Sequence, residues 1–369
     1  MNHLYMSRKI ALFLPSLRGG GAERIMVYLA NSFTERGFSV DLVLVSAEGP
    51  YRSFVASQVK IFDLKCNRAL TSLPKLMSYL RSEKPDVILS TLNHTNVVST
   101  IANSLNGGSH KIIVRVADNL SARKGYLRNI RDWCTLCLVK YAYSQADAVI
   151  AISRGVADDL VKSYGVPRDK VKTIYNPAIT PCICDKAKEE ISHPWFAPGE
   201  PPVILGVGRL TAQKDFVTLL QAFSIVNQQY SSRLIILGEG EERNKLESII
   251  ENLKLETQVS LPGFVDNPFA YMRQASVFVF SSRWEGFGNA LLEAMACGTP
   301  VVSTDCPSGP KEILEGGKWG HLVPVGNVEA MAAAIVSSLS GDTRISSNEV
   351  IENRFSFNKI IDQYLSLLL

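Results

Sequence analysis

Long apolar runs are missing from this 369-residue sequence: none reaches the roughly 20 residues that a membrane-spanning helix needs. The first apolar stretch, Ile10–Pro15, is shorter than the core of a secretion signal, so secretion is not expected. The seven cysteines are scattered and odd in number, which fits a reducing compartment better than a disulfide framework. We therefore expect a cytoplasmic protein whose length suits two domains.

The signatures of several other protein classes are missing as well. The cysteine pairs Cys134–Cys137 and Cys182–Cys184 imitate a zinc site, but the first lies in an apolar, helix-like run and the second in a proline-rich stretch, so no metal is expected. Gly19 and Gly21 begin a dinucleotide fingerprint, but Arg24 occupies its third glycine position, which argues against a dehydrogenase. No sheet motif of interleaved aromatic and basic residues appears, so nucleic acid is not an expected partner.

Charge is divided unevenly along the chain. Residues 1–176 hold 24 Lys and Arg against 13 Asp and Glu, a net charge of +11, whereas residues 177–369 hold 15 against 22, a net charge of −7. A basic half suits anionic phosphates or lipid head groups, although two solvated surfaces of unlike charge are the simpler alternative. The basic stretch Arg123–Trp133 suits a membrane interface, with an ordinary helix that has a basic outer face as the alternative. We expect peripheral docking on an anionic membrane, at the inner face of the cell membrane, through the N-terminal half.

Strand-like apolar runs alternate with segments of helical periodicity. Between residues 22 and 36, for example, Ile25, Leu29 and Phe33 share one helix face. The alternation predicts an α/β protein whose parallel sheets carry helices on both faces. The expected strands are residues 10–15, 40–45, 87–89, 112–116, 149–152, 203–207, 234–237, 258–261, 277–280 and 301–303.

The alternation lapses between Pro177 and Pro202, a stretch with six prolines. We expect an N-terminal Rossmann-like domain, a linker, a C-terminal Rossmann-like domain and a final amphipathic helix that packs back towards the first domain. Their ranges are 1–177, 178–202, 203–355 and 356–369. Because open parallel sheets bind ligands at the carboxyl ends of their strands, one domain would hold a nucleotide and the other an acceptor.

The most informative stretch, Ser281–Pro300, follows the expected strand 277–280. Gly286 and Gly288 interrupt regular structure, and residues 289–296 are expected to form a short helix whose free amides receive a diphosphate. Glu285 precedes this helix and Glu293 lies about one turn inside it, so the carboxylates fall on either side of the phosphate position. One would accept hydrogen bonds from sugar hydroxyls and the other from a ribose diol, although a loop Glu is usually only solvated.

This stretch closely resembles the family-4 glycosyltransferases of the GT-B fold, whose signature is two glutamates separated by seven residues. Further matching sequence motifs extend the resemblance over nearly the whole chain. They are Gly19–Arg24, Ile152-Ser153, Ile174–Pro177, Gly206–Leu210 with Lys214, Gly238–Gly240 and Pro262–Val265. The resemblance implies two Rossmann-like domains whose parallel sheets face each other across a cleft. It also implies transfer of a sugar from a nucleotide diphosphate sugar with retention of configuration, without a metal or other cofactor.

Roles of individual residues follow from the same resemblance. Arg209 and Lys214 would hold the donor diphosphate and stabilise its charge on departure, Glu285 would grip the transferred sugar, and Glu293 would bind the ribose hydroxyls. Glu285, Arg209 and Lys214 are the implied catalytic residues. The other implied donor-binding residues are Gly19, Gly20, Gly263, Phe264, Gly286, Phe287, Gly288, Asn289, Ala290 and Leu291.

The sequence departs from the family at one position. Many members carry a His after the strand that corresponds to residues 112–116, where this chain has Ala117-Asp118-Asn119. Asp118 or Asn119 would then take the sugar contact assigned to that His. His94, which also follows a strand, is a further candidate for a sugar or acceptor contact, as a cleft-edge or structural residue rather than a catalytic one.

The resemblance also narrows the acceptor. Relatives with a start like that of Gly19–Arg24 and a word like Ser308-Gly309-Pro310 build bacterial surface or glycoprotein glycans on polyprenyl diphosphate. We expect a UDP-sugar donor, with N-acetylhexosamine ahead of glucose or galactose, and a glycan or lipid-linked glycan acceptor. The alternatives are a nucleotide-sugar epimerase of GT-B shape, which needs acid and base groups where this sequence offers few His, and a non-catalytic nucleotide-sugar-binding protein.

Overall fold

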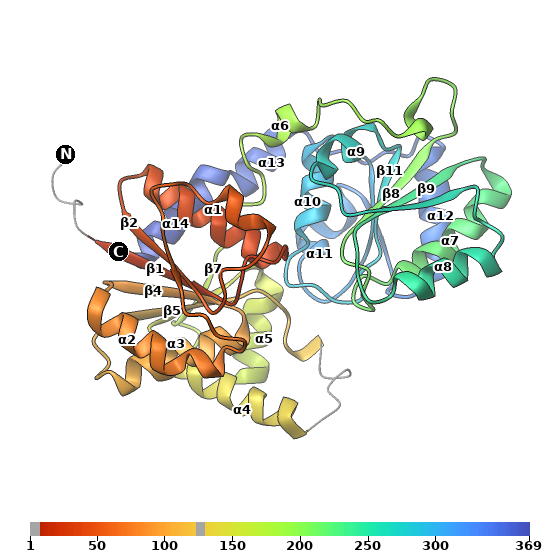
Figure 1. Ribbon diagram of the computed structural model, residues 1–369. Coiled ribbons are helices and arrows are strands. Elements are labelled where there is room, and N and C mark those ends of the chain that lie inside the picture. Colours follow the sequence, from red (N-terminus) through yellow and green to blue (C-terminus); the bar gives the residue numbers. More distant parts are fainter. Residues whose placement is uncertain (1–7, 123–129) are drawn as a thin grey trace. The chain divides into compact units, whose positions relative to one another are not determined.

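The computed structural model describes residues 8–122 and 130–369 and divides into two compact units (Figure 1). The first unit holds the chain up to Pro177 together with Asn358–Leu369, and the second holds Ala178–Phe357. Each unit is built on one parallel sheet. Among the described residues, no helix is both long enough and apolar enough to cross a bilayer.

A seven-stranded sheet forms the first unit, in the order β3-β2-β1-β4-β5-β6-β7. β1 and β4 are neighbours although β2 and β3 come between them in the chain, so the strand order reverses there. The strands are β1 Lys9–Leu14, β2 Ser39–Leu44, β3 Lys60–Asp63, β4 Val87–Thr91, β5 Lys111–Val116, β6 Ala148–Ala151 and β7 Val171–Thr173. The helices are α1 Gly21–Glu35, α2 Leu73–Glu83, α3 Asn93–Leu105, α4 Ile130–Gln145, α5 Arg154–Tyr164 and α14 Phe357–Leu368, with the 3-10 turns η1 Pro50–Phe54 and η2 Leu70–Ser72.

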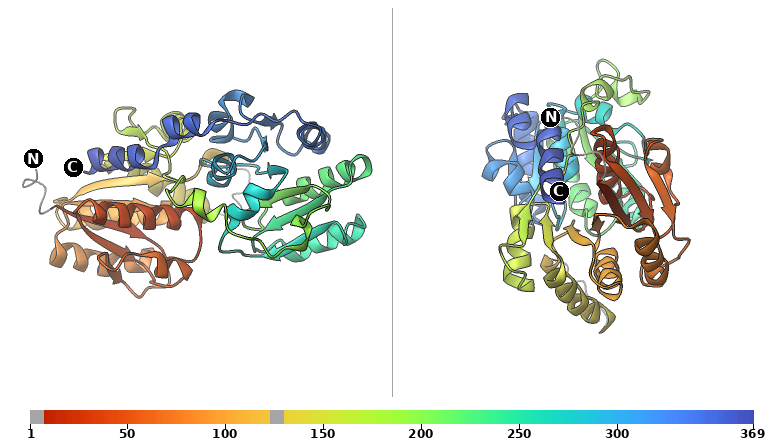
Figure 2. Two further views of the ribbon diagram at one scale, coloured as in Figure 1. Left: turned by 90° about the horizontal axis from the view of Figure 1, so that it is seen from above. Right: turned by 90° about the vertical axis from the view of Figure 1, so that its left-hand side faces the viewer.

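Helix α14, the last in the chain, packs on this first unit beside α1 (Figure 2). Its apolar residues recur at helical spacing and their side chains are buried, as in Ile361, Tyr364 and Leu368. At the end of α1, the Arg36 side chain donates a hydrogen bond to Asn358 over 2.9 Å. From Ile10 to Leu14 the central strand β1 is apolar and buried, because the sheet is covered on both faces.

The second unit repeats this architecture with six parallel strands in the order β10-β9-β8-β11-β12-β13. The strands are β8 Val203–Val207, β9 Arg233–Leu237, β10 Val259–Gly263, β11 Val277–Phe280, β12 Val301–Thr304 and β13 His321–Val323. The helices are α6 Ile183–Lys186, α7 Phe216–Gln229, α8 Arg243–Asn252, α9 Pro268–Gln274, α10 Asn289–Ala296, α11 Pro310–Ile313, α12 Val328–Leu339 and α13 Asn348–Phe355, with the 3-10 turns η4 Pro194–Phe196 and η5 Glu315–Gly317.

The ten expected strands and the α/β class are confirmed, and α10 spans the expected residues 289–296. Three strands were not expected: β3, β7 and β13. All three lie at or next to sheet edges and are three or four residues long, and β3 and β7 include exposed charged residues. Such strands lack the apolar run that identifies a buried strand.

The proline-rich stretch 178–202 is a packed part of the second unit rather than a free connection. The Asn267 side chain donates hydrogen bonds to the Lys186 carbonyl over 2.8 Å and to the Glu189 carboxylate over 2.7 Å. The Phe196 and Tyr271 rings lie edge to face, with their centroids 5.7 Å apart. Aromatic side chains within the stretch therefore fasten it to α9, which composition alone does not reveal.

Candidate active site

The strand order of the second sheet reverses between β8 and β11, which pair in parallel although β9 and β10 come between them in the chain. In open parallel sheets, ligands bind beyond the carboxyl ends of the strands at such a reversal. The loop after β8, residues 208–215, and the loop after β11, residues 281–288, both begin at this edge. The predicted residues Arg209, Lys214 and Glu285 belong to these two loops.

Hydrogen bonds tie the two loops to each other. The Ser281 hydroxyl donates to the Lys214 carbonyl over 2.6 Å, and the Arg283 backbone N–H donates to the Gln213 carbonyl over 2.8 Å. In the opposite direction, the Gln213 side chain donates to the Trp284 carbonyl over 2.9 Å. Because the backbone of each loop is fixed against the other, the charged side chains between these contacts have little freedom to separate.

Lys214 and Glu285 form an ion pair at the centre of the two loops. The Lys214 Nζ lies 2.5 Å from the Glu285 Oε1, which also accepts a hydrogen bond from the Ser282 hydroxyl over 2.8 Å. Glu285 is only 8% exposed, so its charge needs these partners. Within residues 8–122 and 130–369, no hydrogen-bond partner of Oε2 is found, which leaves this oxygen available to accept from a ligand hydroxyl.

Arg209 belongs to the same 208–215 loop as Lys214, but it points to solvent. Its side chain makes no ion pair with any described residue. Its backbone is nevertheless fixed, because a neighbouring glycine turn packs against it. A Cβ at Gly238 would lie 2.0 Å from the Gly208 carbonyl oxygen, and a Cβ at Gly240 would lie 2.3 Å from that of Leu210. These close contacts explain why both positions of the Gly238–Gly240 motif are glycine, and they leave the Arg209 guanidinium available for an anion.

Helix α10 begins at Asn289, and the residue that caps it, Gly288, has a φ of +109°, which other residues rarely adopt. Glu293 is the fifth residue of this helix and is 2% exposed. The Phe287 and Leu291 side chains are buried in the core, so a donor contact at these two positions would come from the backbone. Gly286 and Gly288 are also buried, whereas Asn289 and Ala290 are half-buried.

Gly309 supports the start of α10 from the neighbouring loop after β12. A Cβ at Gly309 would lie 1.7 Å from the Phe287 carbonyl oxygen, and its φ is +92°. No other residue type fits this position without a shift of the backbone. The Ser308-Gly309-Pro310 word, which sequence analysis associates with relatives of one kind, thus has a direct physical role beside the predicted site.

Phe264 follows β10 and is 58% exposed, which suits the predicted contact with a base. Gly263, with a φ of +91°, lies beside the Glu239 carboxylate, which is 2.8 Å from the position of a Cβ. The Arg243 guanidinium donates to both oxygens of Glu239 over 2.8 and 2.6 Å and holds the pKa of that carboxyl below its usual value.

The remaining predicted residues belong to the first unit. Gly19 and Gly20 follow β1, and Gly20 caps α1 at the β1/β4 reversal. His94 is the second residue of α3, just after β4, and desolvation by surrounding protein atoms lowers the pKa of its imidazole below the usual value. Asp118 and Asn119 follow β5; Asn119 accepts a hydrogen bond from the Ala122 N–H over 3.0 Å and so shapes its own turn.

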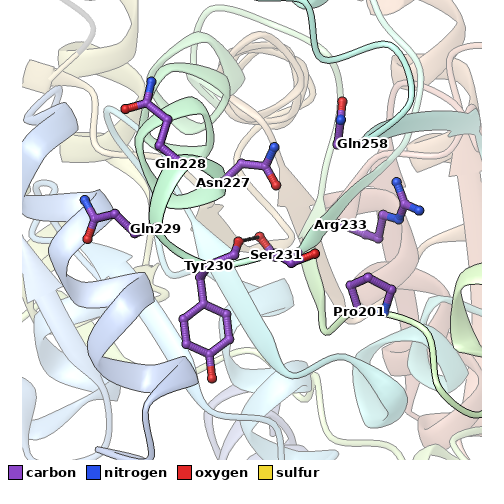
Figure 3. A pocket seen from close by; sticks show the side chains of 9 residues that line it. Pro201, Asn227, Gln228, Gln229, Tyr230, Ser231, Arg233 and Gln258 are labelled. Atoms are coloured by element: carbon purple, nitrogen blue, oxygen red, sulfur yellow. Dashed lines mark hydrogen bonds between the residues drawn. The ribbon is translucent and has the colours of Figure 1, made fainter.

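Most of the predicted membrane segment Arg123–Trp133 lies outside the described residues. The structure describes the backbone again from residue 130, but not the side chains of the rest of this segment. Further along α4, Leu138 and Tyr141 are exposed, one helical turn apart. A separate polar cavity lies in the second unit at the amino ends of β8, β9 and β10, between Pro201, Arg233 and Gln258 (Figure 3). It lies at the sheet edge opposite the 208–215 and 281–288 loops and contains none of the predicted residues.

Comparison with known proteins decides the family. The model described as Glycosyltransferase Family 4 matches residues 19–180, and the model described as Glycosyl transferases group 1 matches residues 187–356. The lipopolysaccharide core biosynthesis glycosyltransferase LpsE of Rhizobium meliloti is 31% identical over 95% of this chain and 96% of its own. The chain belongs to the family-4 glycosyltransferases.

A further relative of this glycosyltransferase comes from Campylobacter jejuni. It is N-acetylgalactosamine-N,N'-diacetylbacillosaminyl-diphospho-undecaprenol 4-alpha-N-acetylgalactosaminyltransferase, 29% identical over 91% of both chains. Among solved structures, Anabaena HepE in complex with UDP and glucose matches with a TM-score of 0.81 and 21% identity, over 98% of this chain and 99% of its own. The glycosyltransferase thus has the GT-B fold.

Sequence reasoning missed several residues that build the site of this glycosyltransferase. Gln213, Asp215, Ser281, Ser282 and Arg283 make the contacts that join the two loops. Their signal was weak, since a polar residue after a strand is commonplace. It becomes informative only when the sheet order shows that the strands before them are neighbours.

Proposed function

We propose that this glycosyltransferase moves a sugar from a UDP-sugar, with N-acetylhexosamine ahead of glucose or galactose, to a glycan carried on polyprenyl diphosphate. The product would be a bacterial surface polysaccharide or related glycan, made with retention of configuration and without a metal. One observation carries the proposal: the Lys214–Glu285 pair stands at the β8/β11 reversal, with exposed Arg209 nearby in the same loop and the start of α10 directly after it.

Each group has a role that its surroundings support. The ammonium of Lys214 and the guanidinium of Arg209 would neutralise the donor diphosphate and stabilise the charge that grows on it as the sugar leaves. The free Oε2 of Glu285 would accept hydrogen bonds from sugar hydroxyls, and the buried carboxylate of Glu293 would take the ribose. Lys214 and Arg209 would together supply the electrostatic stabilisation that a metal ion gives in other phosphate sites.

Retention would follow from attack on the face that the diphosphate leaves. Glu285 is a poor candidate for a covalent nucleophile, because its Oε1 already accepts from Lys214 and Ser282. Such an ion-paired carboxylate is better suited to holding hydroxyls than to attacking carbon. The acceptor hydroxyl would instead enter beside the leaving phosphate, and a phosphate oxygen would accept its proton.

The relatives support the choice of donor and acceptor. HepE was solved with UDP and glucose, the Campylobacter relative is named for transfer of N-acetylgalactosamine to a diphospho-undecaprenol acceptor, and LpsE is named for lipopolysaccharide core biosynthesis. A chain with the same fold, and with Lys214 and Glu285 held together, is suited to a donor and an acceptor of these kinds. In a donor screen with membrane lipid extract, nucleoside diphosphate should be released from one UDP-sugar only when extract is present.

Extract dependence separates this proposal from its alternatives. An epimerase would convert its UDP-sugar without any acceptor, and a non-catalytic binder would release nothing under either condition. Addition of EDTA to the productive reaction leaves the rate unchanged if no metal takes part. Radiolabel that stays in the aqueous phase, with none in the lipid phase, would exclude a lipid-linked acceptor.

We also propose that the protein docks on the inner face of an anionic membrane through the first unit. The exposed Leu138 and Tyr141 of α4 are apolar groups that an interface would cover, and the first 176 residues carry a net charge of +11. Flotation with vesicles should rise steeply with the fraction of anionic lipid and fall in Leu138→Ser/Tyr141→Ser. Binding that is indifferent to lipid charge would contradict the docking.

A further inference from the structure

Asp215 directly follows Lys214 and precedes helix α7, and its carboxylate has more polar contacts than a residue before a helix needs. It is 2% exposed, and its φ of +48° lies in the left-handed region that costs an ordinary residue about 1 kcal/mol. The Thr218 hydroxyl donates to its Oδ2 over 2.8 Å at the start of α7. A buried carboxylate in a strained backbone persists only where its partners compensate for both costs.

Its main partner comes from the other loop of the site. The Arg283 Nε lies 2.9 Å from Oδ2 of Asp215, and Nη2 donates to Oδ1 over 3.1 Å. One hydrogen bond and a second close ion-pair contact join the planar guanidinium to both carboxylate oxygens, which restricts orientation as well as distance more than a single lysine ammonium does. The pair therefore sets the angle between the loops and not only their separation.

The positions of the pair along the chain give it a purpose. Asp215 is the residue directly after Lys214, and Arg283 stands two residues before Glu285. Any relaxation of the pair moves the backbone that carries the Lys214 ammonium relative to the backbone that carries the Glu285 carboxylate. The hydrogen bonds of Gln213 and Ser281 lie beside it but are single and uncharged, so they define the angle less strictly.

We propose that Asp215 and Arg283 are positioning residues that hold Lys214 and Glu285 in register for sugar transfer. The inference rests on the proposed function, because it assigns Lys214 to the leaving diphosphate and Glu285 to the sugar. The pair raises turnover rather than donor affinity, since the cation must match charge that is largest in the transition state. A misplacement of about 1 Å costs up to 100-fold in rate, which sets the scale of the effect.

The test compares Arg283→Gln, Asp215→Asn and the double variant with Arg344→Gln. Arg344 is the matched control, since its side chain is 44% exposed like that of Arg283 and pairs with Asp342 away from both loops. We expect each single variant to lower kcat by about 10- to 100-fold with donor KM within about threefold, and the double variant to be no worse than the poorer single. Arg283→Lys, which keeps the charge but loses the fork, should fall between wild type and Arg283→Gln.

Amide hydrogen exchange provides a readout that needs no substrate. In Arg283→Gln, peptides covering 209–215 and 281–288 should exchange faster together while other peptides stay protected, and the urea midpoint should fall because buried Asp215 loses its charged partner. Arg344→Gln should change neither the exchange nor the midpoint. Unaltered exchange in either loop, or faster exchange with an unchanged kcat, would overturn the positioning role of Asp215 and Arg283. A wild-type protein that turns over no nucleotide sugar would overturn the proposed function instead. The exchange experiment would then test by itself whether the Asp215–Arg283 pair holds the two loops together.

Discussion

At the scale of single residues, the candidate site is a set of charges that neutralise one another until a ligand arrives. Lys214 holds one oxygen of Glu285, and the Ser282 hydroxyl shares that oxygen. The pair is mostly buried, so removal of one partner leaves the other desolvated and uncompensated. The exposed Arg209 has no such constraint and is free to follow a diphosphate.

Replacement of Lys214 by Ala, or of Glu285 by Gln, should lower kcat/KM for donor by at least about 100-fold, because each removes a group aimed at the reacting part of the substrate. The measurement is steady-state release of nucleoside diphosphate with saturating acceptor. Lys318→Ala serves as the control, since Lys318 is an exposed lysine 3.6 Å from its own Glu315 partner. Turnover by both site variants within about threefold of wild type would contradict the roles assigned to them.

At the scale of elements, short glycine turns decide how closely the loops around the site approach one another. Gly238 and Gly240 bring the turn after β9 against the Arg209 loop, and Gly309 brings the turn after β12 against Phe287. The turns determine where the backbone amides at the start of α10 point, and hence whether they can receive an anion.

Gly309→Ala should therefore impair transfer as well as stability. The new Cβ would meet the Phe287 carbonyl, so the start of α10 must move, and we expect a loss of about 2 kcal/mol in unfolding free energy with at least about a 10-fold fall in kcat. Gly298→Ala is the matched control, because its φ of +81° is similar but its Cβ meets nothing within 4 Å. It should cost about 1 kcal/mol and leave kcat unchanged. Equal effects of the two changes on kcat would refute the supporting role of Gly309.

At the scale of the whole molecule, chemistry and stability occupy opposite edges of the sheets. In the first unit, the amino edge carries a charge network in which the Lys9 ammonium lies 2.9 Å from buried Asp41 and also binds Glu83. The Tyr79 hydroxyl donates to Asp41 over 2.6 Å. The carboxyl edge of the second sheet carries Lys214 and Glu285. Substitutions at the two edges should therefore separate stability from turnover.

The amino-edge network predicts a pH dependence. Its hydrogen bond from Lys9 lowers the pKa of Glu83 below the ordinary value of 4.5. A depressed carboxyl pKa stabilises the fold above the unfolded-state value, and this contribution is lost as pH falls through the folded-state value. Glu83→Gln should therefore flatten the decline of the urea midpoint below about pH 5. Glu256→Gln is the control, because Glu256 is exposed and makes no ion pair with any described residue, and it should leave the decline unchanged. A decline that is equally steep in Glu83→Gln would show that the Lys9–Glu83 contact does not contribute to stability.

Metal independence is a prediction for the whole protein. Transfer and thermal stability should be the same after dialysis against EDTA as before it, because Lys214 and Arg209 supply the positive charge. Activity that is lost with EDTA and restored by Mg²⁺ or Mn²⁺ would show that these side chains are insufficient.

The order of apolar runs, turns and helical segments predicted the α/β class and ten of the strands, because a buried parallel strand is mostly apolar. The spacing of Glu285 and Glu293 around a helix start predicted a donor site there, since the pattern is local to that stretch. The short strands β3, β7 and β13 carried no such signal, and neither did the contacts of residues 178–202 with α9.

Only the tertiary structure brought Lys214 to Glu285, 71 residues away in the chain, and Arg283 to Asp215. Those contacts depend on β8 lying next to β11, a consequence of how the whole sheet packs rather than of any local propensity. For the same reason, the sequence could not show that the loop at Gly309 lies against Phe287.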